Sequence, residues 1–193
     1  MVLLVTGFLF THCATKSMST DFYKYQANNN GLIIGTVTFP KNVQWFDKYF
    51  FRLKDMEKNN AVEFTINSYE TVNDPAPENN YTKKYVFVIE RKPGKYEINH
   101  LRLFADNHEA EGVTYFGWVK DFSIPINVTK GEITYIGDIF CLEDLENKSI
   151  SFNVKDTYEH DVRYFKSKSS LINWMKVTKS IIQPIYQTTS SRL

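Results

Sequence analysis

The chain has 193 residues, of which 42% are hydrophobic and 23% are charged, so it has room for one domain with a sizeable core. Its formal net charge is +1 and no polybasic run occurs, which argues against nucleic-acid binding. Aromatic residues make up 16% of the chain, and because aromatic side chains favour strands, the composition favours an all-β fold.

The chain begins with an apolar run from Val2 to Phe10 that ends shortly before Cys13. A transmembrane helix needs about 20 apolar residues, so the run is too short to span a bilayer. It has the length of the apolar part of a signal peptide, and the residues after the cysteine are small and polar. We therefore predict a signal peptide over residues 1–12 and a flexible tether over residues 13–30.

This arrangement resembles the signal of bacterial lipoproteins, in which a peptidase cuts before a cysteine that carries a diacylglycerol. The resemblance implies that Cys13 is lipidated and that the protein is held at a membrane of the cell envelope. The implied membrane is the outer membrane, with the protein on its periplasmic or surface face. Two positions depart from the usual pattern, because His12 replaces a small residue and Phe10 replaces leucine, and the usual positive charge at the start is absent. The alternative is a buried first strand with a core cysteine.

Strand patterns recur after the predicted tether and are separated by turn residues at intervals of about 8–12 residues. Residues 61–70 alternate with a period of two, which places Val62, Phe64 and Ile66 on one face. We predict an all-β fold, an antiparallel β-sandwich of eight to nine strands over residues 31–157. The expected strands lie within residues 31–40, 42–55, 61–70, 84–105, 112–119, 122–128, 133–142 and 149–157.

Local features within these strands give sharper expectations. The strands on either side of Pro93-Gly94 form the clearest predicted hairpin, with a type II turn, because that turn needs a fixed φ followed by a positive φ. In the second of these strands the apolar residues change phase, which predicts a bulge near Asn99 and His100. Pro125 lacks a backbone donor, so its segment is expected to be an edge or bulged strand.

After residue 157 the apolar period changes to that of a helix. We predict one amphipathic helix over residues 169–182, which starts earlier if Asp161 caps it. The helix and tail, residues 158–193, are expected to pack on the sandwich and to cover the aromatic segment around Trp45. Alternatively, that segment is an exposed platform for a protein partner or a sugar.

The segments "KPGKYEINHLRL" and "FSIPINVTKGEITYIGDI" are similar to a pattern found in many small bacterial lipoproteins. Those domains look like transthyretin-type or carboxypeptidase-regulatory β-sandwiches, so the resemblance implies a sandwich over about residues 31–157 and a mostly non-catalytic role. It carries over no catalytic residue. The matching residues are Pro93, Gly94, Lys95, Tyr96, Gly131, Glu132, Tyr135, Ile136 and Gly137, and we expect the last of these to mark a bulge or a close backbone approach.

Few residues are candidates for a ligand site. His108, Glu109 and Glu111 lie close together in the sequence and could hold a cation through carboxylate oxygens, although a solvated loop also explains them. The carboxylates of residues 156–161 precede the predicted helix, where they are expected to stabilise its N-terminus. Cys141 lies among apolar neighbours and is expected to be a small buried thiol.

The sequence contains no HExxH, CxxC or GxSxG motif and no phosphate-binding glycine loop, so we predict no cofactor, no metal and no enzymatic activity. We expect a lipid-anchored domain that binds an envelope protein or glycan, or supports the envelope structurally. One alternative is a hydrolase of envelope polymers, which requires a pocket that gathers Asp and Glu with His100 or His160. Another is a secreted binding domain without an anchor.

Overall fold

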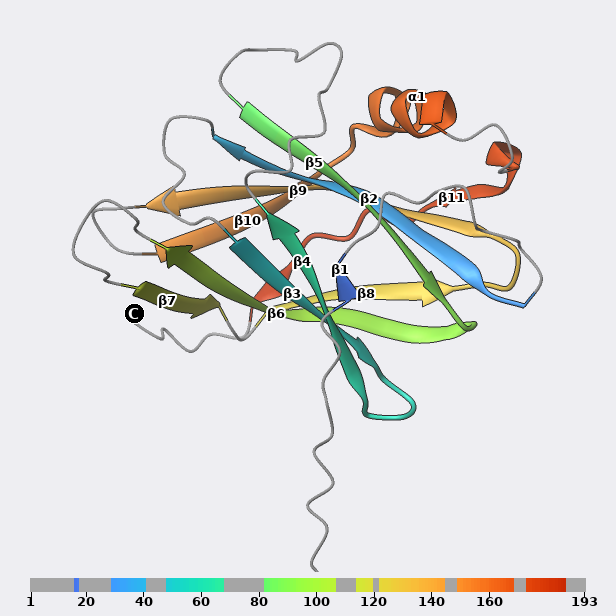
Figure 1. The fold of residues 1–193 in the computed structure, drawn as a ribbon. Coiled ribbons are helices and arrows are strands. Elements are labelled where there is room, and N and C mark those ends of the chain that lie inside the picture. The colour runs from blue at the N-terminus through green and yellow to red at the C-terminus, as the bar shows by residue number, and fades with distance from the viewer. Residues whose placement is uncertain are drawn as a thin grey trace, which may run out of the picture.

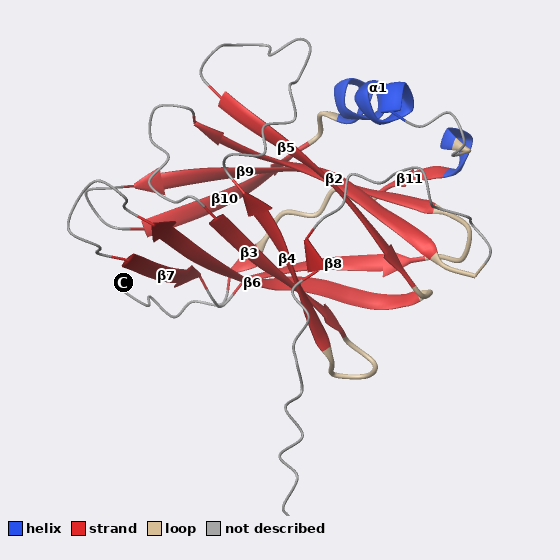
Figure 2. Cartoon of the chain, in the orientation of Figure 1, coloured by secondary structure: helices blue, strands red, loops and turns tan. Residues whose placement is uncertain are grey.

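The computed structural model describes residues 16–17, 29–40, 48–67, 82–106, 114–119, 122–144, 149–168 and 173–186. Within these residues nine strands of six or more residues and three shorter ones form two sheets, with one α-helix near the C-terminal end (Figures 1 and 2). The elements are β1 (Lys16–Ser17), β2 (Gly31–Pro40), β3 (Lys48–Asp55), β4 (Ala61–Asn67), β5 (Thr82–Arg91), β6 (Gly94–Asp106), β7 (Thr114–Val119), β8 (Phe122–Val128), β9 (Ile133–Asp144), β10 (Ser149–Lys155), α1 (Tyr158–Lys168), the 3-10 helix η2 (Trp174–Lys176), β11 (Val177–Lys179) and β12 (Ile185–Tyr186).

The first sheet has seven strands in the order β1-β4-β3-β6-β8-β12, with β7 also paired to β6. The 13-residue strand β6 pairs with β3 along one edge and with β8 and then β7 along the other. Only β1 runs parallel to its partner, since Lys16 and Ser17 lie beside Phe64 and Thr65 of β4. This pair falls within the predicted tether, whose residues 18–28 lie outside the described part of the chain.

The second sheet has five strands in the order β10-β9-β2-β5, with β11 also paired to β9. Strand β2 is antiparallel to β5 but parallel to β9, and β11 is likewise parallel to β9. Both sheets are therefore mixed, and the prediction of a purely antiparallel sandwich is wrong. Side chains alternate with a period of two in both kinds of ladder, so the sequence pattern does not report strand direction.

The core lies between the two sheets and is rich in aromatic side chains. The ring centroids of Phe39 in β2 and Tyr49 in β3 are 4.0 Å apart, and those of Phe64 in β4 and Phe87 in β5 are 5.6 Å apart. Each pair joins one sheet to the other, and all four side chains are at most 4% exposed. Burial of side chains of this size contributes about 1.5–3 kcal/mol each, so these contacts hold the sheets together.

The turn at Pro93-Gly94 does not form the predicted hairpin. Its two flanking strands belong to different sheets, β5 to the second and β6 to the first. Gly94 has a φ of +158°, whereas a type II turn requires about +80°. The turn therefore carries the chain from one sheet to the other. The Tyr96 hydroxyl stabilises the turn by donating a hydrogen bond to the carbonyl oxygen of Lys92 at 2.9 Å.

The predicted bulge in β6 is confirmed. Arg52 of β3 pairs with His100, but the next residue of β3 pairs with Ile98, so β6 has one extra residue, Asn99. The extra residue restores the phase, and Ile98 and Leu101 both point into the core with no exposed surface. Most of the predicted alternation in β4 also holds, although Val62, near the start of the strand, is 40% exposed.

Strand β8 lies near an edge, as its proline predicts. On its outer side it pairs, in the described chain, with β12 through Phe122 and Ser123, and Pro125 lies beyond this pair. The predicted bulge at Gly137 is also confirmed, because β9 has one extra residue relative to β2 there and Gly137 has a φ of +97°. A Cβ at Gly137 would lie 2.6 Å from Val154 Cγ1, so the backbone approach is close as well.

The helix α1 lies earlier in the chain than predicted. Within the predicted range 169–182, the described residues 173–182 contain one 3-10 turn and the strand β11 instead of an α-helix. Val177 and Thr178 are β-branched and pair with Ile133 and Thr134 of β9, so sheet pairing overrides the helical spacing of the apolar residues. No helix in the described residues is long and apolar enough to cross a membrane.

Helix α1 covers the outer face of the second sheet, whereas we expected it to cover the aromatic segment before and within β3 (Figure 1). Phe165 of α1 has no exposed surface and packs with Leu32 and Ile34 of β2. Its ring also lies 6.1 Å from that of Trp174 in η2. Because core side chains cover one face of β2 and the helix covers the other, nine consecutive residues of this strand are buried.

Candidate functional site

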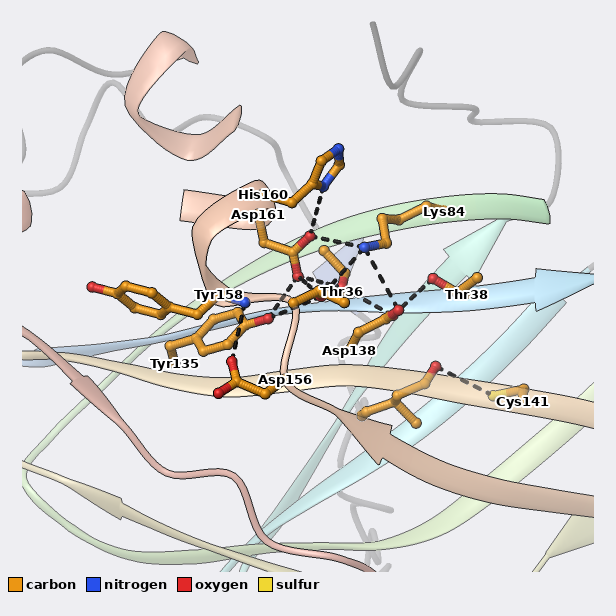
Figure 3. Close-up of polar contacts among 12 residues, drawn as sticks. Thr36, Thr38, Lys84, Tyr135, Asp138, Cys141, Asp156, Tyr158, His160 and Asp161 are labelled. Carbon is orange, nitrogen blue, oxygen red and sulfur yellow. Dashed lines mark hydrogen bonds and ion pairs between the residues drawn. The ribbon is translucent and has the colours of Figure 1, made fainter. Parts of the chain in front are cut away.

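A cluster of charged side chains lies buried between helix α1 and the second sheet (Figure 3). Asp161 of α1 is 1% exposed and Asp138 of β9 is 3% exposed. The side chain of Lys84 on β5 points toward both, with Nζ 2.8 Å from Asp161 Oδ1 and 3.6 Å from Asp138 Oδ2. We call Lys84, Asp138 and Asp161 the buried triad.

Hydroxyl groups surround the Asp161 carboxylate. Its Oδ2 accepts hydrogen bonds from Tyr135 OH and Thr157 Oγ1, both at 2.7 Å, and lies 2.9 Å from Thr36 Oγ1. Its Oδ1 faces Lys84 and also lies 3.2 Å from His160 Nδ1. Donors therefore reach both oxygens of this carboxylate, which favours its ionised form.

Thr36 connects the two carboxylates of the buried triad. Its Oγ1 lies 3.0 Å from Asp138 Oδ1 and 2.9 Å from Asp161 Oδ2. Thr38, on the same side of β2, donates to Asp138 Oδ1 at 2.7 Å. Because a hydroxyl has only one hydrogen to donate, Thr36 can serve one carboxylate at a time and can pass a proton between them.

The bulge at Gly137 places Asp138 in this cluster. In an unbroken strand Asp138 would point to the face opposite Tyr135 and enter the core. The extra residue shifts the phase, so that Tyr135 and Asp138 both face the helix while Ile136 and Ile139 fill the core. Gly137 therefore has two effects: it permits the backbone conformation of the bulge, and the bulge in turn directs the Asp138 carboxylate toward the helix.

The surroundings push the pKa values of the two carboxyl groups apart. Burial raises the pKa of Asp138 above its ordinary value, and the charge of Lys84 only partly offsets this. Burial acts in the same direction on Asp161, but the charge of Lys84 and the hydrogen bonds from Lys84, Tyr135 and Thr157 together lower its pKa. Burial also raises the pKa of Tyr135, so its hydroxyl stays a donor.

We predict that Asp138→Asn gains stability relative to the wild type as the pH rises. The pKa of Asp138 is raised above its ordinary value of 3.8, so its favourable contribution is present below that value and is lost as the pH rises through the folded-state pKa. An amide does not titrate. The free energy of unfolding is measured by urea titration at a series of pH values for both proteins. The wild-type value minus the variant value should fall as the pH rises through this window.

Asp156→Asn is the control for this pH experiment, because the pKa of Asp156 is lowered, first by its hydrogen bond with Lys179. The wild-type advantage over this variant should rise as the pH rises from the folded-state pKa to 3.8. A rising difference for Asp138→Asn as well would show that burial does not dominate the titration of Asp138.

The start of α1 differs from our expectation, since Asp161 does not cap the helix. The carbonyl oxygen of Thr157 accepts from the Asp161 amide at 3.0 Å, which makes Thr157 the capping residue. Asp156 accepts from the amide of Tyr158 at 3.1 Å and pairs with Lys179, as expected of a carboxylate at a helix N-terminus. Asp161 instead reaches down to the sheet.

The sequence-predicted site residues Cys13, Trp45, His108, Glu109 and Glu111 all lie outside the described residues and stay predictions. In the described part of the chain, no group of three or more His, Cys, Asp or Glu side chains has the arrangement of a metal site.

The two histidines of the hydrolase alternative lie on different parts of the fold. His100 is on β6 of the first sheet, opposite Arg52, and His160 is on α1 beside Asp161. Cys141 is fully buried, as predicted, with Sγ 3.9 Å from the carbonyl oxygen of Ile139.

Sequence reasoning missed the buried triad. Lys84 and Asp161 are 77 positions apart in the chain. The pairing of β2 with both β5 and β9 brings Lys84 near Asp138, and the docking of α1 adds Asp161. One available signal was Asp138, a charged residue within an apolar strand, because buried charges require partners.

A second feature is the outer face of the first sheet, where charged and aromatic side chains alternate across β3 and β6. Arg102 pairs with Glu63 at 2.8 Å and lies over the ring of Phe50 at 4.5 Å. Lys48 lies over the ring of Phe104 at 5.1 Å. We call this set the charged face; its described residues include Lys48, Phe50, Arg52, Lys54, Glu63, Thr65, Lys95, Glu97, His100, Arg102 and Phe104.

Comparisons with known proteins assign no family to this chain. No known protein family and no curated protein matches the sequence. The crystal structure of a "Putative cell adhesion protein from Parabacteroides distasonis ATCC 8503" is similar with 11% sequence identity and a TM-score of 0.29. The match covers 65% of this chain and 38% of that protein, so the chain spans well under two thirds of its length. The description of the fold therefore rests on the strands themselves.

Proposed function

We propose that this chain is a lipid-anchored protein of the cell envelope whose β-sandwich is a non-enzymatic binding domain. The charged face is the observation that carries the binding role. It presents five lysine or arginine side chains against two glutamates, although the net charge of the whole chain is only +1. Helix α1 covers part of the outer face of the second sheet, so the charged face is the better docking surface.

Three of the five cations of the charged face are held in place by neighbouring side chains. Arg102 and Lys48 lie over aromatic rings, and the Arg52 guanidinium donates to Asn99 Oδ1 at 2.9 Å. A surface whose cations are already ordered loses less entropy when it binds an array of carboxylates. This favours a linear acidic glycan of the envelope as the ligand, with an acidic protein surface as the other outcome of the test. The resemblance to transthyretin-type or carboxypeptidase-regulatory sandwiches supports the non-enzymatic role.

We predict that Lys48→Gln combined with Lys95→Gln weakens binding to an acidic polysaccharide such as polygalacturonate by several-fold. Each exposed charge contact contributes about 0.2–1 kcal/mol, and added salt should reduce the difference. Affinity measured at low and high salt, with neutral dextran in parallel, checks this. The matched control is Lys166→Gln combined with Lys176→Gln, two exposed lysines on α1 and η2, which pack on the second sheet. Equal losses for both pairs would contradict a specific surface.

The anchor is the second part of the proposal and rests on the apolar run that ends at Cys13. Buried acyl chains contribute about 0.8 kcal/mol per methylene, so two or three chains hold a protein firmly at a membrane. We predict that the native protein begins at Cys13 with added acyl mass, and that Cys13→Ala is soluble or unprocessed. Intact mass of the protein from its native membrane checks this.

The matched control for the anchor is Cys141→Ala, because Cys141 is the second cysteine of the chain and is fully buried. This variant should stay at the membrane with its lipid. A wild-type protein that keeps residues 1–12 and carries no lipid would refute the anchor but leave the binding surface to be tested by itself.

A further inference from the structure

The buried triad places a primary amine against a carboxyl group, with a second carboxyl group beside both (Figure 3). Lys84 lies on β5, Asp161 on α1 and Asp138 on β9, so three separate elements meet at this point. An amine and a carboxyl group in contact can remain an ion pair or condense to an amide. We propose that Lys84 and Asp161 condense to an intramolecular isopeptide bond, and that Asp138 moves the protons.

The reaction is balanced without an oxidant, reductant or other reagent. A proton passes from the Lys84 ammonium to the Asp161 carboxylate, and the neutral amine attacks Asp161 Cγ. The C–N bond forms, one C–O bond of the carboxyl group breaks, and the oxygen leaves as water with two of the three amine protons. Asp138 gives a proton to the leaving oxygen and takes one from the nitrogen, so it ends in the state in which it began.

Burial favours the amide over the ion pair. The side chains of Lys84, Asp138 and Asp161 are 16%, 4% and 1% exposed. Two opposite charges at such a place carry a desolvation penalty, which their attraction and their hydrogen bonds have to offset. Condensation replaces both charges with one neutral amide and therefore removes this penalty.

The hydroxyl groups around Asp161 stabilise the charge that develops during the attack. Addition of the amine to Cγ places negative charge on a carboxyl oxygen. Asp161 Oδ2 already accepts hydrogen bonds from Tyr135 and Thr157 at 2.7 Å, and such preorganised donors stabilise an oxyanion. The fixed contact of 2.8 Å between Lys84 Nζ and Asp161 Oδ1 supplies the proximity that makes the step effectively unimolecular.

Asp138 is suited to proton transfer by its position. Its Oδ2 lies 3.6 Å from Lys84 Nζ, which is itself 2.8 Å from Asp161 Oδ1, the oxygen that leaves. The hydroxyl of Thr36, 3.0 Å from Asp138 Oδ1, holds the carboxyl group in this position. Burial raises the pKa of Asp138, so it holds a proton at higher pH than an exposed carboxyl group does.

The bond would tie helix α1 to β5 across the second sheet and close a loop between residues that are 77 positions apart. Such a link restricts the unfolded chain and keeps α1 docked, as a disulfide would, without requiring an oxidising compartment. This inference depends on neither the lipid anchor nor the charged face.

Another lysine–aspartate pair in the same chain serves as an internal control. Lys179 Nζ lies 3.1 Å from Asp156 Oδ2, but these side chains are 44% and 49% exposed. Water solvates both charges there, so no desolvation penalty favours condensation, and we expect this pair to stay ionic.

The test is the intact mass of the denatured full-length protein, measured beside Lys84→Arg. The wild type should be lighter than its sequence by one water molecule, after any N-terminal processing common to both proteins, and Lys84→Arg should show no such loss. Digestion should yield the Lys84 peptide joined to the Asp161 peptide, with the Lys179 and Asp156 peptides unlinked. A wild type at its full sequence mass, or loss of water at another pair, would overturn the proposal.

The role of Asp138 is tested separately with Asp138→Asn, in which the amide cannot shuttle protons. After synthesis, the linked form should accumulate at least about 100-fold more slowly than in the wild type, the usual minimum for loss of a general acid–base group. Linkage at the wild-type rate would exclude Asp138 as the proton carrier. If this variant does not fold, the wild-type mass alone still decides whether the bond exists.

Discussion

Phe51→Ala should lower the free energy of unfolding by about 3–5 kcal/mol, whereas Phe50→Ala should lower it by only about 1 kcal/mol. The two residues are neighbours on β3 but point to opposite faces. Phe51 has no exposed surface, and its ring lies 5.3 Å from that of Phe64 in the core. Phe50 lies on the charged face, where its ring contacts the Arg102 guanidinium.

Urea unfolding of the two alanine variants checks the register of β3. The dependence of the unfolding free energy on urea concentration should stay unchanged, so that only the midpoint moves. A one-residue slip would exchange the two faces and reverse the order of the two losses. Equal losses would show that the two faces of β3 are equally buried and would contradict this register.

Phe165→Ala should lower the free energy of unfolding by about 3–5 kcal/mol, because it leaves a cavity where helix α1 meets the second sheet. Phe165 is fully buried and lies in the apolar cluster of Leu32 and Ile34. The expected effect is large because Phe165 is a large, fully buried side chain of the cluster that joins α1 to the sheet.

Lys166→Ala is the control for Phe165→Ala, because Lys166 follows it on α1 and is exposed. The control should unfold at the wild-type urea concentration. With Trp45 and Trp118 replaced by Phe in both proteins, the fluorescence of Trp174 gives a local readout, since its ring lies 6.1 Å from Phe165 and should become more exposed to water in the alanine variant. If the two variants behave alike, α1 does not dock as described.

The two outer faces of the sandwich differ in what covers them and in their side chains. Helix α1 and the buried triad occupy the outer face of the second sheet, where β2, β5 and β9 supply the polar partners. The charged face of the first sheet instead carries cations that lie over aromatic rings. We therefore assign a structural role to the first of these surfaces and propose the second for binding.

Alternation in the sequence was sufficient to predict most strands and the side that each turns to the core. Phe64 and Ile66 in β4 are buried as their spacing indicates. The phase change in β6 was also sufficient to predict its bulge, because a strand that keeps one face in the core needs an extra residue wherever its pattern shifts. These features depend on near neighbours in the chain, which the sequence displays directly.

The sequence by itself therefore determined the nine long strands, the inward face of those that alternate, the β6 bulge and the glycine bulge of β9. Only the tertiary structure decided that β5 and β6 lie in different sheets, that β2 runs parallel to β9 and that α1 covers the second sheet. A turn residue such as Gly94 shows that the chain reverses, but hydrogen bonding between distant strands selects the partner. The buried triad belongs to this second class, because its three charges meet only after the strands have paired and the helix has docked.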